Sequence, residues 1–224
     1  MSRKKLIIIG AGGNGTVILS TLHDVNSNQK NKIDFLGFLD DNVVNSNILG
    51  KVNLQQINKF KKYNDIYFLW SLRSTKLGLN INKKFRSLKI NKNKFLTIVH
   101  PSCVISKFAK LGYGSTIHPF VNIGPNVSIG NHVHIFSQSM IGHDTKIENF
   151  SYIANNASIG AYVKINEGGY VGMNSSIRER INIGKWSTVG MGSVVLKDVK
   201  SNQIVFGNPA KKYMIKFNLT KLKI

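Results

Sequence analysis

The chain has 224 residues, a length that supports one or two domains with sizeable cores. Its 31 basic and 10 acidic residues give a formal charge of +21, which favours polyanionic partners such as nucleic acid, anionic lipid or phosphate-bearing cofactors. No zinc-finger, RNP-like or arginine-rich segment accompanies this charge, so nucleic acid is not predicted, and a basic solvated surface is the simplest alternative. The single cysteine, Cys103, excludes an internal disulfide and indicates a reducing compartment.

The start of the chain resembles a signal peptide only briefly. SRKK precedes the apolar run LIII, but this run stops at glycines after four residues. A signal-peptide core or a membrane span needs a longer apolar segment. We therefore expect a cytoplasmic protein without membrane contact.

The first part of the chain alternates between strand and helix patterns. Short apolar runs at 5–9, 35–39 and 66–72 predict buried strands, and apolar residues recur at helical spacing over 17–25. A more polar helix is predicted over 54–63. Strands that alternate with helices indicate a parallel α/β sheet.

From Cys103 to Asp198 the chain divides into sixteen consecutive hexads, each with an aliphatic residue in third place. The residue two places earlier is nearly always small or valine, and alternate residues of a strand point to the same side. A glycine often follows the aliphatic residue, and we expect it to permit a sharp corner. Each hexad therefore predicts one short strand and one corner.

These hexads resemble the hexapeptide repeat of acyltransferases that form a left-handed parallel β-helix. The resemblance implies three hexads per coil, a little over five coils, and a left-handed winding that is an exception to the usual crossover rule. It implies a β-helix domain over 100–205, followed by a basic tail over 206–224. Covering the last open coil is the favoured role of this tail, with anionic lipid or the phosphates of coenzyme A (CoA) as alternatives.

An eighteen-residue coil places residues eighteen apart in one column. Pro125, His143, Ala161 and Glu179 share a corner column, so the side chain of His143 projects outward while Ile141 points inward. The neighbouring Asp144 can accept a hydrogen bond from one imidazole nitrogen, which fixes the tautomer and makes the other nitrogen a better base. A solvated corner pair is the alternative.

Five motifs extend the resemblance over nearly the whole chain: IIIGAGGNG at 7–15, GFLDDN at 37–42, HPSCVIS at 100–106, GHD at 142–144 and GNPAK at 207–211. Together they resemble the bacterial sugar O- and N-acyltransferases, which include UDP-4-amino-sugar N-acetyltransferases and sialic-acid O-acetyltransferases. This resemblance implies a Rossmann-like nucleotide-sugar-binding domain over 1–99 ahead of the β-helix.

The resemblance also implies roles for individual residues. His143 would be the general base and Asp144 its orienting partner, while the Ala161 N–H would hold the carbonyl of the acetyl-CoA thioester. Tyr152 stands where relatives often carry a second histidine that positions acetyl-CoA, and Lys211 and Lys212 would lie near CoA.

A phosphate-binding loop is predicted in the first domain. Gly10, Gly12 and Gly15 form GxGxxG after a strand and before a helix, with Gly13 between them. The motif is also typical of NAD or FAD binding. Fewer than a hundred residues precede the repeats, however, and a full dinucleotide fold needs a second half.

Acidic and basic residues near the strand ends are further candidates. Asp40 and Asp41 are adjacent in a chain that is poor in acids, which favours hydrogen bonds to a nucleotide, and the resemblance implies the same; a turn before Asn42 is the alternative. Arg73 could reach a phosphate or be an ordinary surface arginine.

No metal site is predicted. His118, His132 and His134 suggest a three-histidine zinc site, but their register places them on different faces of the coil. Cys103 takes an inward position in the core, and His100 marks the domain junction.

The resemblance therefore implies acetyl-CoA-dependent N-acetylation of a nucleotide-linked amino sugar in cell-surface glycan biosynthesis. The resemblance implies a homotrimer with active sites between subunits. The alternatives are O-acetylation of sialic acid or another sugar, a noncatalytic nucleotide-sugar-binding protein, and a nicotinamide-dependent oxidoreductase.

Overall fold

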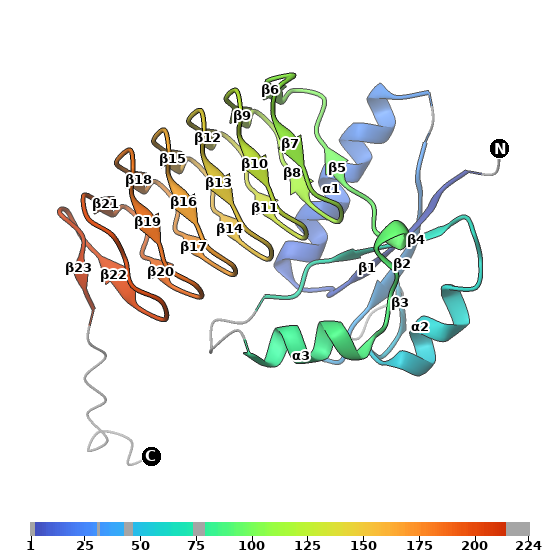
Figure 1. Ribbon diagram of the computed structural model, residues 1–224. Coiled ribbons are helices and arrows are strands. Elements are labelled where there is room, and N and C mark those ends of the chain that lie inside the picture. Colours follow the sequence, from blue (N-terminus) through green and yellow to red (C-terminus); the bar gives the residue numbers. More distant parts are fainter. Residues whose placement is uncertain (1–2, 31, 43–46, 74–78, 214–224) are drawn as a thin grey trace, which may run out of the picture.

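The structure is a computed structural model that describes residues 3–30, 32–42, 47–73 and 79–213. An α/β domain lies at one end of a long β-helix, with helix α1 against the first coils (Figure 1). The predicted fold class, an α/β domain followed by a left-handed parallel β-helix, is confirmed.

The α/β domain contains a four-stranded parallel sheet in the order β3-β2-β1-β4, as the alternating pattern predicts. Its strands are β1 (Lys5–Ile9), β2 (Asp34–Leu39), β3 (Ile48–Gly50) and β4 (Ile66–Trp70). Its helices are α1 (Gly13–Asn28), α2 (Leu54–Phe60), α3 (Leu79–Ser87) and the short 3-10 helix η1 (Lys92–Lys94).

Both faces of this sheet are buried, which explains the continuous apolar runs of its strands. On one face, Leu6 and Ile8 pack in a cluster with Leu22 of α1. On the other, Ile7 and Ile9 pack in a cluster with Ile57 of α2, Leu88 and Phe95. Because β1 pairs parallel with both β2 and β4, the carboxyl ends of these three strands meet at one edge of the sheet, beside the start of α1.

The β-helix has three faces, each a parallel sheet of very short strands. The docked face, against which the α/β domain packs, contains β5 (Ile98–Val99), β8 (Thr116–Ile117), β11 (His134–Ile135), β14 (Tyr152–Ile153), β17 (Tyr170–Val171), β20 (Thr188–Val189) and β22 (Ile204–Phe206). The lysine face contains β7 (Lys110–Leu111), β10 (Ser128–Ile129), β13 (Lys146–Ile147), β16 (Lys164–Ile165) and β19 (Asn182–Ile183). The serine face contains β6 (Val104–Ile105), β9 (Asn122–Ile123), β12 (Met140–Ile141), β15 (Ser158–Ile159), β18 (Ser176–Ile177) and β21 (Val194–Val195).

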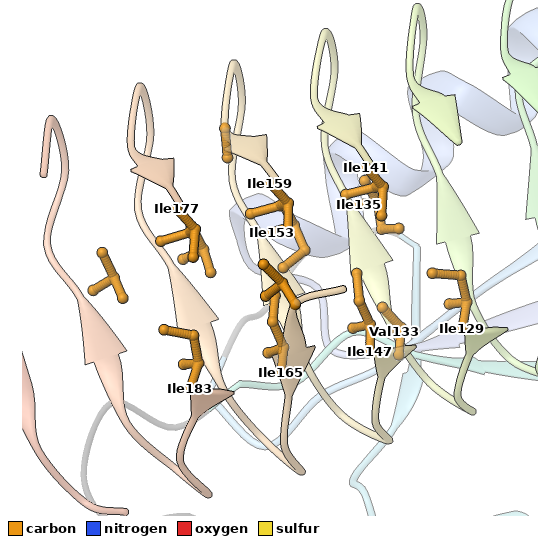
Figure 2. Packing of buried hydrophobic residues seen from close by; sticks show 14 of the residues in the cluster. Ile129, Val133, Ile135, Ile141, Ile147, Ile153, Ile159, Ile165, Ile177 and Ile183 are labelled. Atoms are coloured by element: carbon orange, nitrogen blue, oxygen red, sulfur yellow. The ribbon is translucent and has the colours of Figure 1, made fainter. Parts of the chain in front are cut away.

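The third-place aliphatic residues form the core of the β-helix. Ile141 pairs in register with Ile159, and Ile159 with Ile177, so residues eighteen apart lie above one another. Figure 2 shows these isoleucines stacked along the axis. Each buried side chain contributes about 1.5–3 kcal/mol of transfer free energy, so repetition alone makes a continuous core.

The expected reason for the frequent fourth-place glycine is wrong. The corner is turned by the sixth-place residue, which takes a left-handed φ of 58° at Asp144, 58° at Tyr162 and 70° at Gly114. The fourth-place glycines instead allow close contact between coils, since a Cβ on Gly142 would lie 2.7 Å from the backbone nitrogen of Ala161. These glycines are needed for their small volume rather than for their conformational freedom.

The coils extend beyond both ends of the sixteen hexads. The first strand of the docked face, β5, lies in the preceding hexad TIVHPS. At the other end the spacing shortens to sixteen residues, with Thr188 paired to Ile204. The strand β23 (Lys211–Lys212) then pairs antiparallel with β22 at the last coil.

Candidate active site

His143 and Asp144 lie in the turn between β12 and β13, on the edge where the serine face meets the lysine face. Ile141 is 1% exposed in the core, whereas the side chain of His143 is 50% exposed. The hexad register therefore turns the imidazole outward, as predicted. In Figure 1 this turn belongs to the row of loops on the side of the β-helix away from α3.

The Asp144 carboxylate is held between two side chains. Its Oδ2 lies 2.7 Å from Nδ1 of His143, and its Oδ1 accepts a hydrogen bond of 3.1 Å from Nδ2 of Asn126, one coil earlier. The contact with His143, helped by Asn126, lowers the pKa of Asp144, so the group stays a carboxylate. A proton on Nδ1 that donates to this carboxylate leaves the lone pair of Nε2 free to act as a base.

A backbone donor lies one coil further on. Among the described residues the N–H of Ala161 has no hydrogen-bond partner, while the N–H groups of Gly160 and Tyr162 donate to Ile177 and to the carbonyl of His143. Ala161 as a residue is half-buried at this edge. This donor can stabilise a negatively charged oxygen beside His143.

Two more side chains continue this edge. The ring of Tyr162 meets the His143 imidazole edge-to-face, with centroids 5.2 Å apart, and Cζ of Arg180 lies 4.4 Å from the Tyr162 centroid. Sequence reasoning missed Tyr162, Arg180 and Asn126. All three share with Asp144 one eighteen-residue column, and this spacing is the signal that identifies them.

A cavity of about 170 Å³ lies at the carboxyl edge of the α/β sheet, lined by Gly10, Gly12, Gly13, Asn14, Gly15, Ser71, Leu72 and Arg73. Gly15 is required for packing, since its Cβ would lie 2.0 Å from the carbonyl oxygen of Gly10. A Cβ on Gly12 or Gly13 would meet nothing within 4 Å, so the loop is open on its outer side. No side chain caps the start of α1, which leaves its first N–H groups facing this space.

The carboxylates of Asp40 and Asp41 have partners within the domain. Asp40 accepts hydrogen bonds from the N–H of Ala11 at 2.7 Å and of Asn42 at 2.8 Å. Asp41 accepts one from the N–H of Val52 at 2.8 Å and forms an ion pair with Lys84. Asp40 thus makes the turn before Asn42 that the sequence left open, and it also holds the glycine loop at Ala11. Asp41 instead joins the end of β2 to Val52 and to Lys84 of α3.

Arg73 and Tyr152 meet at the junction of the two domains. Cζ of Arg73 lies 5.0 Å from the Tyr152 centroid and 3.6 Å from that of Tyr170. The hydroxyl of Tyr152 donates to Oδ1 of Asn14 at 3.0 Å. Burial raises the pKa of Tyr152 to about 12, which keeps its hydroxyl a neutral donor.

The predicted site residues therefore form two groups. His143, Asp144 and Ala161 lie on one edge of the β-helix, and the glycine loop, Asp40, Asp41 and Arg73 lie with Tyr152 on the docked face. In a triangular coil this face is opposite that edge, so one chain does not bring the two groups together. Lys211 and Lys212 are exposed on β23, and Lys216, Lys221 and Lys223 fall outside the described residues.

The expectation that His118, His132 and His134 lie on different faces is wrong: all three are buried where the α/β domain packs on the docked face. His118 contacts the hydroxyl of Thr21 at 2.7 Å, and Nε2 of His134 lies 2.9 Å from the carbonyl oxygen of Trp70. His132 is enclosed by aromatic rings: Phe85, Phe95, Tyr113 and Phe150. In the described part of the chain no three histidine, cysteine or acidic side chains are grouped as metal ligands.

Each helix in the described ranges is too short or too polar to span a bilayer.

Cys103 is half-buried and packs against the β-helix core. His100 lies at the domain junction, with Nε2 3.5 Å from a carboxylate oxygen of Asp24 in α1.

Residues 5–70 match the family described as the PglD N-terminal domain. No curated protein sequence matches the chain. A solved structure of a perosamine N-acetyltransferase variant from Caulobacter crescentus, in complex with CoA and GDP-perosamine, is similar with a TM-score of 0.81 and 19% identity, over 95% of this chain and 98% of that chain.

Two further solved structures share the fold. The acetyltransferase domain of PglB from Neisseria gonorrhoeae FA1090, in complex with acetyl coenzyme A, has a TM-score of 0.79 and 22% identity, over 95% of this chain and 100% of that chain. WeeI from Acinetobacter baumannii AYE has a TM-score of 0.60 and 21% identity, over 94% of this chain and 100% of that chain. Residues 5–70 are therefore similar to the PglD N-terminal domain, and the chain as a whole shares the fold of these three solved structures.

Proposed function

We propose that the protein is an acetyl-CoA-dependent N-acetyltransferase that acts on the amino group of a nucleotide-linked amino sugar in glycan biosynthesis. One observation carries this proposal: an exposed histidine, oriented by a carboxylate, lies one coil from a backbone N–H that has no partner among the described residues. The similar C. crescentus protein was crystallised with CoA and GDP-perosamine, which supports the same substrate classes here.

The chemistry follows from these groups. Nε2 of His143 removes a proton from the sugar amine as its nitrogen bonds to the thioester carbonyl carbon, and this contributes about 10²–10⁴ in rate. The carbonyl oxygen gains negative charge and accepts a hydrogen bond from the Ala161 N–H. The C–S bond then breaks, and CoA leaves as a thiolate that takes up a proton. Asp144 stays ionised and stabilises the imidazolium.

The nucleotide binds, in this proposal, at the cavity of the α/β domain. The N–H groups at the start of α1 and the guanidinium of Arg73 contact its phosphates. Asp40 and Asp41 shape the surrounding loops, because their carboxylates already accept backbone hydrogen bonds. In the same proposal Lys211 and Lys212 contact CoA.

We infer that the active site forms between copies of the chain. The His143 edge and the cavity lie on opposite sides of one β-helix, so the amine of a nucleotide sugar in that cavity meets His143 of a neighbouring copy. A homotrimer satisfies this requirement with three equal sites. The cytoplasm, expected from the single cysteine and the short apolar run, is the compartment we propose.

A thiol-release assay tests the function. The full chain is incubated with acetyl-CoA and a panel of UDP-, GDP- and dTDP-linked amino sugars, with sialic acid as the free sugar. The proposal predicts turnover with at least one nucleotide-linked amino sugar and a product acetylated on nitrogen. Turnover on free sialic acid alone would indicate O-acetylation instead, and binding without any turnover would indicate a noncatalytic protein.

A further inference from the structure

Arg73 of the α/β domain lies on two tyrosines of the β-helix. It follows β4 by three residues, and its Cζ is 3.6 Å from the ring centroid of Tyr170 and 5.0 Å from that of Tyr152. The two tyrosines are register partners on β17 and β14, with centroids 5.3 Å apart and planes 29° apart. A stacked aromatic pair therefore supports a guanidinium from the other domain.

The Arg73 guanidinium has no carboxylate partner among the described residues. Loss of hydration at this junction lowers the pKa of Arg73, and the two tyrosines partly offset this effect. Arginine keeps its charge in such a place, and its side chain still has a face open to solvent. One of its donors is engaged with the Tyr170 hydroxyl, and the remaining N–H donors are available to an anion.

The same tyrosine pair also touches the other wall of the cavity. The hydroxyl of Tyr152 holds Asn14, which follows Gly12 and Gly13 at the start of α1, at 3.0 Å. Arg73 lines this cavity together with the glycines. One aromatic pair thus fixes both the cationic wall and the glycine wall of a single space.

We propose that Tyr170 is a positioning residue for the nucleotide end of the substrate. Its ring holds the Arg73 guanidinium against the cavity, where Arg73 and the N–H groups of the glycine loop together bind a diphosphate. Tyr152 supports the loop from the same stack. This inference rests on the proposed function, and it makes the β-helix part of the nucleotide site within one chain.

Calorimetric titration of the full chain with UDP, GDP and dTDP tests the inference, with the parent nucleosides as ligands that lack phosphates. Tyr170→Leu removes the ring and is expected to weaken diphosphate affinity about tenfold, as is Arg73→Met. The double variant is expected to bind no more weakly than Arg73→Met alone, because the tyrosine acts through the arginine. Nucleoside affinity is expected to stay unchanged in all variants.

Two further variants separate this role from a structural one. Tyr170→Phe keeps the ring and is expected to retain wild-type diphosphate affinity even if Tyr170→Leu lowers thermal stability. Tyr63→Leu removes another tyrosine that lies beneath a cation, Lys62 at 5.2 Å, and is expected to leave affinity unchanged. In the acetylation assay, Tyr170→Leu is expected to raise KM for the nucleotide sugar and to leave KM for acetyl-CoA unchanged.

The inference fails if Tyr170→Leu binds diphosphate like the wild type, or if the two single effects add fully. A Tyr170→Leu variant that loses affinity for the nucleosides as well as for the diphosphates would also overturn it. Such a result would indicate that the substitution collapses the cavity as a whole. If the wild type binds none of the three diphosphates, the proposed nucleotide site itself is wrong. Wild-type diphosphate binding without acetyl transfer would contradict only the proposed activity.

Discussion

Asn126 donates a hydrogen bond of 3.1 Å to Asp144 from the coil below, so the carboxylate that faces His143 is anchored on its other side. Residues eighteen apart lie above one another in this fold, and the repeat itself therefore brings the two side chains together. The winding of the chain thus orients the histidine through two successive contacts.

Replacing Asp144 by Asn tests this orientation. The substitution removes the charge that stabilises the imidazolium and is expected to lower kcat about tenfold or more, with little change in KM. Steady-state kinetics of the variant and the wild type with the nucleotide sugar check this expectation. Asn126→Ala, which frees only one carboxylate oxygen, is expected to give a smaller loss. An unchanged kcat in Asp144→Asn would show that the pair is an ordinary solvated corner.

The repeat offers a clean way to remove the backbone donor at Ala161. Proline already occupies the same place of the hexad at Pro119 and Pro125, so Ala161→Pro is expected to fold. Loss of the N–H is expected to lower kcat about 10²-fold. Steady-state kinetics and thermal melting check the two expectations together. Glu179→Pro, one coil further in the same column, is the matched control and should keep full activity.

The close contact at Gly142 gives a prediction about stability. A methyl group there would lie 2.7 Å from the backbone nitrogen of Ala161, and backbone cannot move aside as a flexible side chain can. Gly142→Ala is therefore expected to destabilise the protein by about 1–3 kcal/mol, measured by urea denaturation. Gly13→Ala, where the added carbon meets nothing within 4 Å, should cost little. Equal losses in both variants would contradict the account of the fourth-place glycine.

The buried histidines predict a loss of stability in acid. Burial lowers the pKa of His118 and of His132 to about 3, and that of His134 to about 4. The unfolded chain binds protons near pH 6.5, so the free energy of unfolding is highest above this pH and falls as the pH drops toward 4.

His132 allows this explanation to be tested at one residue. Among the described residues neither of its ring nitrogens has a partner, and the aromatic rings around it suit phenylalanine. Its left-handed φ of 56° is shared by Phe120 and Phe150 at the same place of the hexad. Urea titrations of His132→Phe between about pH 6 and pH 4.5 should show a slope smaller than that of the wild type by about 1–1.4 kcal/mol per pH unit. A slope equal to that of the wild type would contradict the assignment.

The sequence predicts the β-helix well, because each hexad repeats one local pattern. The constant spacing of the hexads also predicts which residues of successive coils are paired. The same register predicts the outward position of His143. In the α/β domain, the buried strands β1, β2 and β4 follow from their apolar runs, whereas β3 is too short to give a pattern. The sheet that these strands form follows from their alternation with helices.

The remaining contacts depend on distant parts of the chain. The hydrogen bond from Tyr152 to Asn14 joins residues 138 positions apart and depends on how the α/β domain packs on the docked face. The partners of Asp40 and Asp41 lie on separate loops, at Ala11, Val52 and Lys84. No local spacing predicts such contacts, and this is why the sequence proposed free carboxylates where the structure has occupied ones.

The central claim is that the imidazole of His143 performs proton removal during acetyl transfer. The most direct measurement is kcat for His143→Asn with acetyl-CoA and the best nucleotide-linked amino sugar, with His23→Asn on the exposed face of α1 as control. We expect His143→Asn to lose about 10²–10⁴ in kcat with little change in KM for the sugar, and the control to match the wild type. Full activity of His143→Asn would contradict the account.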